Sequence, residues 1–328
     1  MTLYPWLQPY YQQSVHAFQQ GHGHHALLFK AEQGLGAEQL LQALGHWLIC
    51  QQVKGLQPCG QCHHCLLAKA QHHPDIYTLA PIDNKDIGVD QVREVNEKIN
   101  QHAQQGGNKL IYVLGVERLT EAAANAMLKT LEEPRPNTYF LLLADVASPI
   151  MPTIYSRCQA TLISIPHADQ AIAWLQSNEI PPHEMSDIQT ALRISYGRPL
   201  DALTVLTEGL LAKRREFLRQ FWLFYRKCSP LELLPFFEKT LIFHQLDWLL
   251  AFLADALKAK LQIRENWICQ DLAAGIEQFS AQQSTQGLLH ALQIMQKVRA
   301  DLININAVNQ DLILLDGLTQ LITDVFEG

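Results

Sequence analysis

A short apolar strand, a turn with two glycines and an amphipathic helical pattern follow one another between residues 26 and 48. The strand is Ala26–Phe29, the glycines are Gly34 and Gly36, and leucines recur at helical spacing over residues 40–48. This order is the layout of a phosphate-binding loop, which joins a buried strand of a parallel α/β sheet to a helix. An ordinary tight turn is the alternative interpretation, because two glycines between a strand and a helix are a weak signal by themselves.

The loop lacks the two residues that would carry its chemistry. A working loop has a lysine after its last glycine to reach the outer phosphates, followed by a hydroxyl residue that holds Mg²⁺. Ala37 and Glu38 occupy these positions. A carboxylate at the start of the helix repels the phosphate that the helix N-terminus would attract. The sequence therefore predicts a loop, Gly34 to Glu38, that has its shape but binds no ATP.

The first 165 residues alternate between strand patterns and helix patterns. Helical periodicity marks residues 40–48, 92–99 and 123–134. Short continuous apolar runs are typical of parallel strands that are buried on both faces. We expect a parallel sheet flanked by helices, with strands at Ala26–Phe29, Leu110–Leu114 and Tyr139–Ala144 and weaker strands at Asp75–Leu79 and Thr161–Ile165.

Strand patterns end near Pro166, and the rest of the chain is helical in character. Residues 166–207 predict three short helices, separated at Pro181-Pro182 and at Gly197. Residues 208–328 predict longer helices with broad apolar faces, which the packing of a helical bundle explains without a catalytic role. We therefore expect three domains, covering residues 1–165, 166–207 and 208–328.

Four of the seven cysteines are close together in the sequence, with eight residues between the first two and then two and two. Thiolates crowded in this way repel one another unless a metal ion neutralises them. The spacing suits a tetrahedral cation, so we predict one structural Zn²⁺ bound by Cys50, Cys59, Cys62 and Cys65 in an inserted loop at about residues 50–65. The other three are scattered, as buried small hydrophobes usually are: Cys158, Cys228 and Cys269.

Other sites could use the same cysteines. An iron–sulfur cluster of the bacterial type would need a further cysteine four positions after Cys65, where Lys69 stands. A thioredoxin-like redox pair is disfavoured because three cysteines share the loop. His46, His63 and His64 are alternative metal ligands.

Two further segments resemble bacterial clamp-loader subunits, which are AAA+ proteins. The third helical pattern ends in Leu128-Lys129-Thr130-Leu131-Glu132-Glu133-Pro134, and Ser156-Arg157-Cys158 follows the strand Tyr139–Ala144. The first residues, Tyr4–Leu7, and the altered loop are also similar to clamp-loader subunits of DNA polymerase III. The resemblance covers residues 1–205 closely and the rest only in helical character.

The resemblance implies an N-terminal α/β AAA+ domain with a zinc-module insertion, a small helical lid domain and an all-α collar domain. It also implies further losses at the nucleotide site. The acidic pair that organises Mg²⁺ and water falls on Leu114-Gly115, and a polar sensor residue falls on Ala144-Asp145. Glu117 lies two residues late. The sensor arginine of the second domain falls on Leu200, with Arg198 as a stand-in.

By the same resemblance, Arg157 is the residue that acts on a neighbour's nucleotide, with Ser156 capping or orienting it. A guanidinium beside a γ-phosphate offsets charge in the transition state, and lysine lacks its planar fork. The alternatives are a surface arginine or an intramolecular ion pair. Cys158 is expected to be packed rather than reactive.

The implied function is that of a non-ATPase subunit supporting ATP-dependent loading of a sliding clamp onto primed DNA. Its partners would be the gamma/tau ATPase subunits and the clamp-opening delta subunit, with the beta clamp and primed DNA as indirect partners. An ATPase with an unusual loop, and a zinc-containing nucleic-acid-binding AAA+ protein with weak ATP binding, are the alternatives. The missing lysine disfavours the first of these alternatives.

Charge disfavours the second alternative. The chain has 25 Lys and Arg against 32 Asp and Glu, a formal charge of −7, whereas a protein that grips duplex DNA alone is expected to be basic. One stretch, residues 213–227, is locally basic, and it is either a contact for DNA or an acidic partner or a solvated helix face. No apolar run reaches the ~20 residues of a membrane span, and the N-terminus lacks the basic region of a secretory signal. We expect a cytoplasmic protein.

Overall fold

The computed structural model describes residues 3–83, 85–178, 184–304 and 309–326. The chain divides into two compact units, Met1–Pro166 and His167–Gly328. They are called the first and the second unit below, and each is described by itself.

The first unit is built on a sheet in which every neighbouring pair of strands is parallel, in the order β2-β3-β4-β1-β5. Leu28 pairs with Leu142 and Ile111 pairs with Phe140, so apolar side chains lie beside one another in the middle of the sheet. The strands are β1 (Ala26–Ala31), β2 (Ile76–Leu79), β3 (Lys109–Leu114), β4 (Thr138–Asp145) and β5 (Gln159–Leu162).

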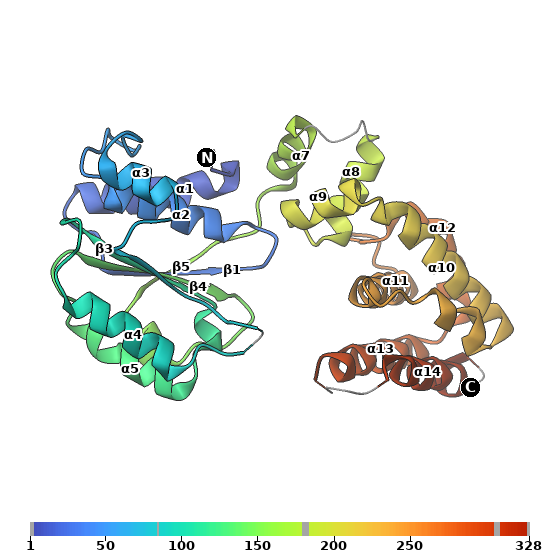
Figure 1. Cartoon of the computed structure of the whole chain (residues 1–328). Coiled ribbons are helices and arrows are strands. Elements are labelled where there is room, and N and C mark those ends of the chain that lie inside the picture. Colours follow the sequence, from blue (N-terminus) through green and yellow to red (C-terminus); the bar gives the residue numbers. More distant parts are fainter. Residues whose placement is uncertain (1–2, 84, 179–183, 305–308, 327–328) are drawn as a thin grey trace. The chain divides into compact units, whose positions relative to one another are not determined.

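Helices cover both faces of this sheet (Figure 1), with α1, α2 and α3 on one side and α4 and α5 on the other. The second face is closed by a hydrophobic core in which α4 and α5 pack on Leu28, Ile111 and Phe140. The helices of this unit are α1 (Gln8–Gln19), α2 (Ala37–Ile49), α3 (His63–Lys69), α4 (Val89–Asn100), α5 (Glu121–Glu132) and α6 (Pro152–Tyr155), with 3₁₀ turns η1 (Pro5–Leu7) and η2 (Val116–Arg118).

Two local expectations need correction. The last strand was expected at Thr161–Ile165 and lies at Gln159–Leu162. It is an edge strand whose side chains are largely exposed, so no hydrophobic alternation marks its register in the sequence. The cysteine segment was expected to be a loop, but a helix begins after Cys62 and runs over His63–Lys69. His64, Cys65 and Ala68 are buried, and this packing stabilises a helix too short to form alone.

The second unit is helical and has one continuous hydrophobic core. Gly197, with a φ of 82°, lies between α8 and α9, where the sequence predicts a break. Pro181-Pro182 lies outside the described residues. The helices are α7 (Ala168–Ser177), α8 (Met185–Ile194), α9 (Pro199–Thr207), α10 (Leu210–Lys227), α11 (Ile242–Lys260), α12 (Ala273–Gln282), α13 (Thr285–Asn304) and α14 (Gln310–Leu321), with short turns η3 (Pro230–Glu232), η4 (Leu234–Phe236), η5 (Gln270–Leu272) and η6 (Ile322–Phe326).

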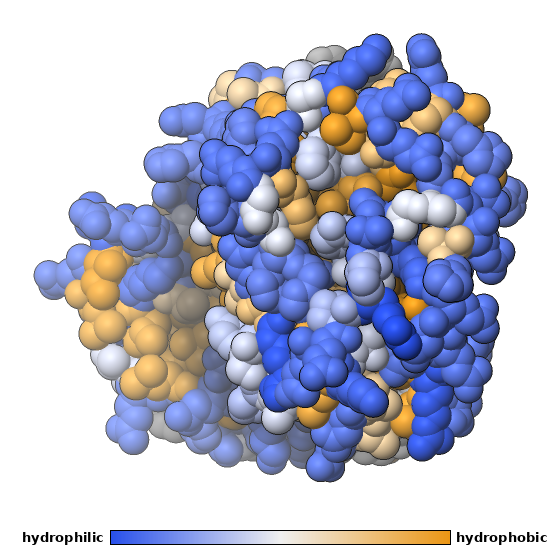
Figure 2. Space-filling view, turned by 90° about the vertical axis from the view of Figure 1, so that its left-hand side faces the viewer, coloured by the Kyte–Doolittle hydropathy of each residue, from blue (hydrophilic) through white to orange (hydrophobic). Residues whose placement is uncertain are grey.

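The surface agrees with this division into core and exterior. Most of the surface in Figure 2 is hydrophilic, with hydrophobic areas between the polar side chains and a broader hydrophobic area at the left of the view. Within the described ranges, no helix combines the length and the apolar character that crossing a membrane requires.

Candidate functional site

The glycine loop has the backbone of a phosphate-binding loop. Gly34 and Gly36 have φ angles of 82° and 69°, in the left-handed region that disfavours residues with a Cβ. Gly36 is also the N-cap of α2, so the free N–H groups of the first helical turn point toward the loop. The loop therefore offers the backbone geometry that an anion would use.

The N-terminal segment packs against this loop. The indole N–H of Trp6 donates a buried 2.8 Å hydrogen bond to the carbonyl oxygen of Leu35. The ring of Tyr4 stacks on Trp6 at 5.0 Å, and the backbone N–H of Tyr4 donates to Gln39 Oε1 at 2.9 Å. These contacts fix the loop without any ligand.

A cavity of about 450 Å³ lies beside the loop. Four carboxylates line it, and none of the described residues around it is a lysine or an arginine. Nucleotide phosphates would therefore meet the negative charge of these four side chains. The carboxylates are those of Glu32, Glu38, Glu117 and Asp145.

The structure brings together three of the segments that the sequence singled out. Ala37-Glu38, Leu114-Gly115 and Ala144-Asp145 all line this cavity. Glu117 lines it too, and its Oε2 accepts a 3.3 Å hydrogen bond from the backbone N–H of Asp145. Arg198 belongs to the second unit, where it pairs with Asp201 at 2.6 Å.

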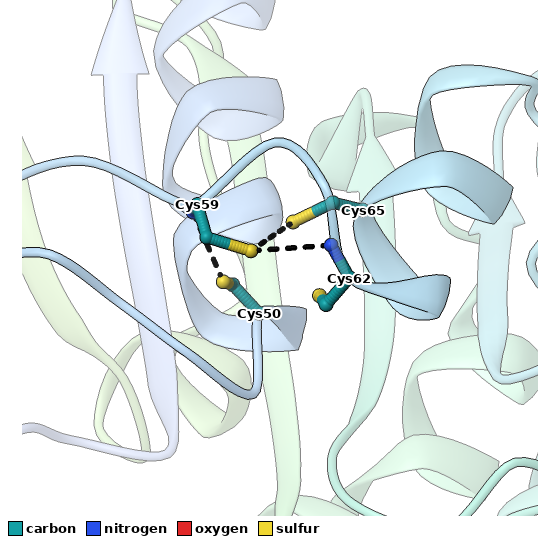
Figure 3. A group of neighbouring side chains, drawn as sticks. All are labelled: Cys50, Cys59, Cys62 and Cys65. Carbon is teal, nitrogen blue, oxygen red and sulfur yellow. Dashed lines mark hydrogen bonds between the residues drawn. The ribbon is translucent and has the colours of Figure 1, made fainter.

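The four cysteines converge on one point (Figure 3). Their sulfur atoms all lie within 4.8 Å of one another, and Cys59 Sγ is 4.0 Å from Cys65 Sγ. Zinc–sulfur bonds of about 2.3 Å in a tetrahedron place sulfur atoms about 3.8 Å apart. Cys50 comes from the end of α2, Cys59 from the following loop, and Cys62 and Cys65 from the start of α3. The donor set therefore fits a single tetrahedral ion.

The surroundings of the thiols also suit a metal. Hydrogen bonds from the backbone N–H groups of Gln61 and Cys62 lower the pKa of the Cys59 thiol to about 6. Burial raises the pKa of Cys50, and burial with the neighbouring thiols of Cys62 and Cys50 raises the pKa of Cys65. The thiolate of Cys59 is thus favoured mainly by the backbone, whereas those of Cys50 and Cys65 need a cation to offset their burial.

The alternative histidine ligands have other contacts. His63 Nε2 is 3.2 Å from Gln105 Oε1, and His64 Nδ1 is 2.9 Å from His73 Nε2 in the interior. His46 does not belong to the cluster that could hold an ion, and burial lowers its pKa. The compact arrangement also disfavours an iron–sulfur cluster, because several iron atoms would hold the four sulfurs farther apart.

Arg157 lies at the surface just after α6, with 29% of its side chain exposed. Its Nε donates to Glu132 Oε1 at 2.7 Å, and its Nη2 contacts the same oxygen. Its Nη1 donates to Thr153 O at 2.7 Å and to Ser156 Oγ at 3.3 Å. The intramolecular ion pair that the sequence left open is thus present, and Ser156 touches the guanidinium.

Near Arg157, the sequence predicts the environment of Cys158 but not the contact made by Glu132. Cys158 packs against the core of the first unit, and burial raises its pKa to about 12, which disfavours the reactive thiolate. The sequence does not mark Glu132 as a site residue, although the Leu-Glu-Glu-Pro segment contains it. The sequence does not show which of the two neighbouring glutamates faces Arg157.

The basic stretch in α10 is not one continuous face. Arg214 is fully buried and pairs with Asp271 at 2.6 Å, contrary to the expectation of a solvated position. Lys213 and Lys227 form exposed ion pairs with Glu238 and Glu232, each at 2.9 Å. These pairings reduce the positive charge available to nucleic acid.

Comparison with known protein families gives two matches. The family described as "DNA polymerase III, delta subunit" matches residues 7–167, and the one described as "DNA polymerase III, delta subunit, C terminal" matches residues 208–323. Together they cover most of both units.

Curated relatives match over the whole chain. The DNA polymerase III subunit delta′ of Haemophilus influenzae is 57% identical over 326 residues, which is 99% of each chain. The subunit of the same name from Escherichia coli K12 is 37% identical over 327 residues, 98% of this chain and 96% of that one.

A solved structure supports the fold. The DNA polymerase III gamma subunit-related protein of Thermotoga maritima aligns with a TM-score of 0.50 over 94% of this chain and 98% of its own, at 17% identity. At this identity the likeness shows the fold alone. With the parallel sheet and the helical second unit, it confirms the predicted fold class, an α/β domain of AAA+ type followed by helical structure.

Proposed function

Since the chain belongs to the family of DNA polymerase III delta′ subunits, we propose that it is a clamp-loader subunit without ATPase activity. In this role it supports ATP-dependent loading of the sliding clamp onto primed DNA. Its direct partners are the gamma/tau ATPase subunits and the clamp-opening delta subunit, and the beta clamp and DNA are reached through them. Such a protein works in the cytoplasm, and residues 166–207 and 208–328 serve as its lid and collar.

The observation that carries the absence of ATP chemistry is the cavity beside the glycine loop. Phosphoryl transfer needs cations around the phosphates, and four carboxylates line this cavity. A ligand with several negative charges would lose its hydration and gain repulsion. Isothermal titration of the isolated chain with Mg-ATP is therefore expected to show no binding at micromolar ligand, and saturable micromolar binding would contradict the proposal.

The trans-acting role belongs to Arg157. Its side chain is partly exposed, and an exposed ion pair such as that with Glu132 adds only ~0–1 kcal/mol to stability. The guanidinium therefore remains accessible to a neighbour's γ-phosphate, and its planar fork suits a bidentate contact. The reaction then belongs to the neighbouring subunit, and this chain contributes one catalytic residue to it.

A zinc ion in the cysteine cluster completes the proposed function as a structural element. Cys50, Cys59, Cys62 and Cys65 would hold it, and it would close the segment between α2 and α3. The chemistry it supplies is charge neutralisation of four thiolates. The role is structural because four protein ligands leave no open coordination position.

The decisive experiment uses Arg157→Ala and Arg157→Lys in a loader reconstituted with its partner subunits. Melting temperature and complex formation should stay near normal, while DNA-stimulated ATP hydrolysis and clamp loading fall for both variants. Arginine fingers contribute ~10³-fold or more at one site, although other ATP sites in the assembly dilute the total loss. A destabilised chain with normal ATPase per assembled complex, or full activity with lysine, would end the trans-acting interpretation.

A further inference from the structure

We infer that Glu132 is a positioning residue for Arg157, holding the guanidinium by one edge and leaving the other edge for a partner's phosphate. This inference rests on the proposed trans-acting role of Arg157 and adds a residue to it. Nothing in the Ser-Arg-Cys segment itself supplies an acidic partner, so the carboxylate has to come from a different element.

The hydrogen bonds define which edge is held. Nε and Nη2 of Arg157 contact the same oxygen of Glu132, so the carboxylate lies at the edge that these two nitrogens share. A guanidinium has five N–H bonds. Within the described residues, the hydrogen of Nη2 on the edge shared with Nη1 is not used by Glu132, Thr153 or Ser156.

At the opposite edge of the guanidinium, a phosphate can replace an existing contact. Nη1 makes a good bond to Thr153 O at 2.7 Å but only a long one to Ser156 Oγ at 3.3 Å. A phosphate oxygen that replaces the serine contact would meet Nη1 and Nη2 together, which is the bidentate arrangement that arginine offers to phosphate. The contact with Glu132 need not break for this to happen.

The position of Glu132 is itself fixed by the sheet. Glu132 is the last residue of α5, and His25 Nε2 bonds to the preceding carbonyl, Leu131 O, at 2.7 Å. A carbonyl only accepts, so Nε2 carries the proton, and burial, which lowers the pKa of His25, favours this neutral form. His25 in turn accepts a 2.7 Å bond at its own carbonyl from Phe140 N–H in β4. The end of α5 is thus tied through His25, the residue just before β1, to Phe140 of β4.

This arrangement explains how a long side chain on the surface can be preorganised. A free arginine samples many rotamers, and ordering it when the neighbour arrives would cost entropy during assembly. The carboxylate orders it beforehand at the cost of a weak surface ion pair. Preorganised charge is more effective in a transition state than charge that must first be ordered.

The test is a double-mutant cycle in the reconstituted loader, with DNA-stimulated ATP hydrolysis measured at several ATP concentrations. Glu132→Ala should lower kcat by about two- to fivefold with little change in KM, because the misplaced group acts in the transition state. Glu132→Gln keeps an acceptor oxygen and should lie between Glu132→Ala and wild type. Glu133→Ala removes the neighbouring exposed carboxylate and serves as the matched control, with no expected change.

The cycle separates a positioning role from a merely structural one. In the Arg157→Ala background, Glu132→Ala should cause no further loss, because its effect passes through Arg157. An equal loss in both backgrounds, no loss at all, or a higher rate in Glu132→Ala would overturn the inference. If Arg157→Ala is impaired while both Glu132 variants are normal, only this inference fails, whereas normal activity of Arg157→Ala defeats the proposed function as well.

Discussion

Helix α2 begins at the glycine loop and ends at the first cysteine of the metal-type cluster, and its two ends differ in what they preserve. At its N-terminus, Gly36 caps the helix in the left-handed conformation that a phosphate loop uses. At its C-terminus, Cys50 is the C-cap and its sulfur accepts N–H bonds from Gln52 and Cys59 at 3.4 and 3.2 Å.

The difference shows which part of a site the backbone can maintain alone. The N-terminal end has the loop shape, but phosphate binding depends on side chains that are absent, and Glu38 adds charge of the wrong sign. The C-terminal end has both, because all four sulfurs are present and the backbone holds them together. We therefore propose that the loop shape alone does not bind nucleotide, whereas the four converging sulfur atoms bind a metal ion.

The largest expected effect is at the cysteine end. Cys62→Ser removes one of the four thiolates. The affinity for zinc should therefore fall by more than the ~10–100-fold that is lost when a residue behind a metal ligand is mutated. We expect about one zinc ion per chain in the unaltered protein and less in the variant after the same chelator treatment. A protease should then cut the variant within residues 50–65 while the sheet stays folded. Metal analysis by mass spectrometry with limited proteolysis checks this.

The control for that experiment is Cys228→Ser, a half-buried cysteine in the second unit. It should keep the full zinc content. Iron with visible absorption, or no metal in protein that never met a chelator, would remove the contrast between the two ends of α2.

A smaller effect is expected in the middle of the helix. A Cβ added at Gly45 would lie 1.9 Å from the hydroxyl oxygen of Tyr112 and 2.5 Å from Leu110 Cδ2, both on β3. Gly45→Ala should therefore destabilise the fold by about 1–3 kcal/mol, more than the ~0.5–1 kcal/mol that alanine gains over glycine in a helix. Thermal unfolding measures this loss. The zinc content should stay unchanged, because all four cysteines come after the last residue of α2 in the sequence.

Two variants sharpen the result. In the Gly45→Ala background, Tyr112→Phe removes the hydroxyl oxygen nearest to the new Cβ and should restore part of the lost stability. The recovery should be incomplete, because Leu110 and the ring of residue 112 remain close. Gly275→Ala in α12, where an added Cβ meets nothing within 4 Å, should be neutral or stabilising. Loss of zinc in Gly45→Ala would mean that the packing of α2 on the sheet, rather than the local backbone, sets the cysteine geometry.

The next effect concerns the N-terminal end. Trp6→Phe leaves the buried carbonyl oxygen of Leu35 without its donor, at a cost of about 1–2 kcal/mol. Unfolding in urea would report it. Trp222→Phe is the control for the change in ring size, because in the described part of the chain no hydrogen bond is found for its indole. Equal losses in both would show that the hydrogen bond to the loop contributes nothing specific.

Sequence patterns predict features that depend on neighbours along the chain. The strands around Leu28, Ile111 and Phe140 and the converging cysteines follow from local apolar runs and ligand spacing. Contacts between distant positions are less accessible. Trp6 and Leu35 are 29 residues apart and Arg157 and Glu132 are 25 apart, and each pair requires the folded sheet to meet.

Tertiary packing also overrides local character. Arg214 sits among basic residues that indicate a solvated face, yet its side chain is fully buried and pairs with Asp271. The helix after Cys62 is invisible to periodicity because it is only seven residues long and is stabilised by burial.

The smallest expected effect comes from restoring the loop itself. Ala37→Lys with Glu38→Thr supplies the two missing residues and changes the formal charge of the cavity lining from −4 to −2. Hydrolysis should nevertheless remain undetectable, because Leu114-Gly115 still stands where acids would organise Mg²⁺ and water. Glu117 does not replace them, since its Oε2 accepts the N–H of Asp145. Turnover by this double variant in a sensitive phosphate-release assay would show that the N-terminal end of α2 lost only two residues, and the contrast with the cysteine end would then be one of degree.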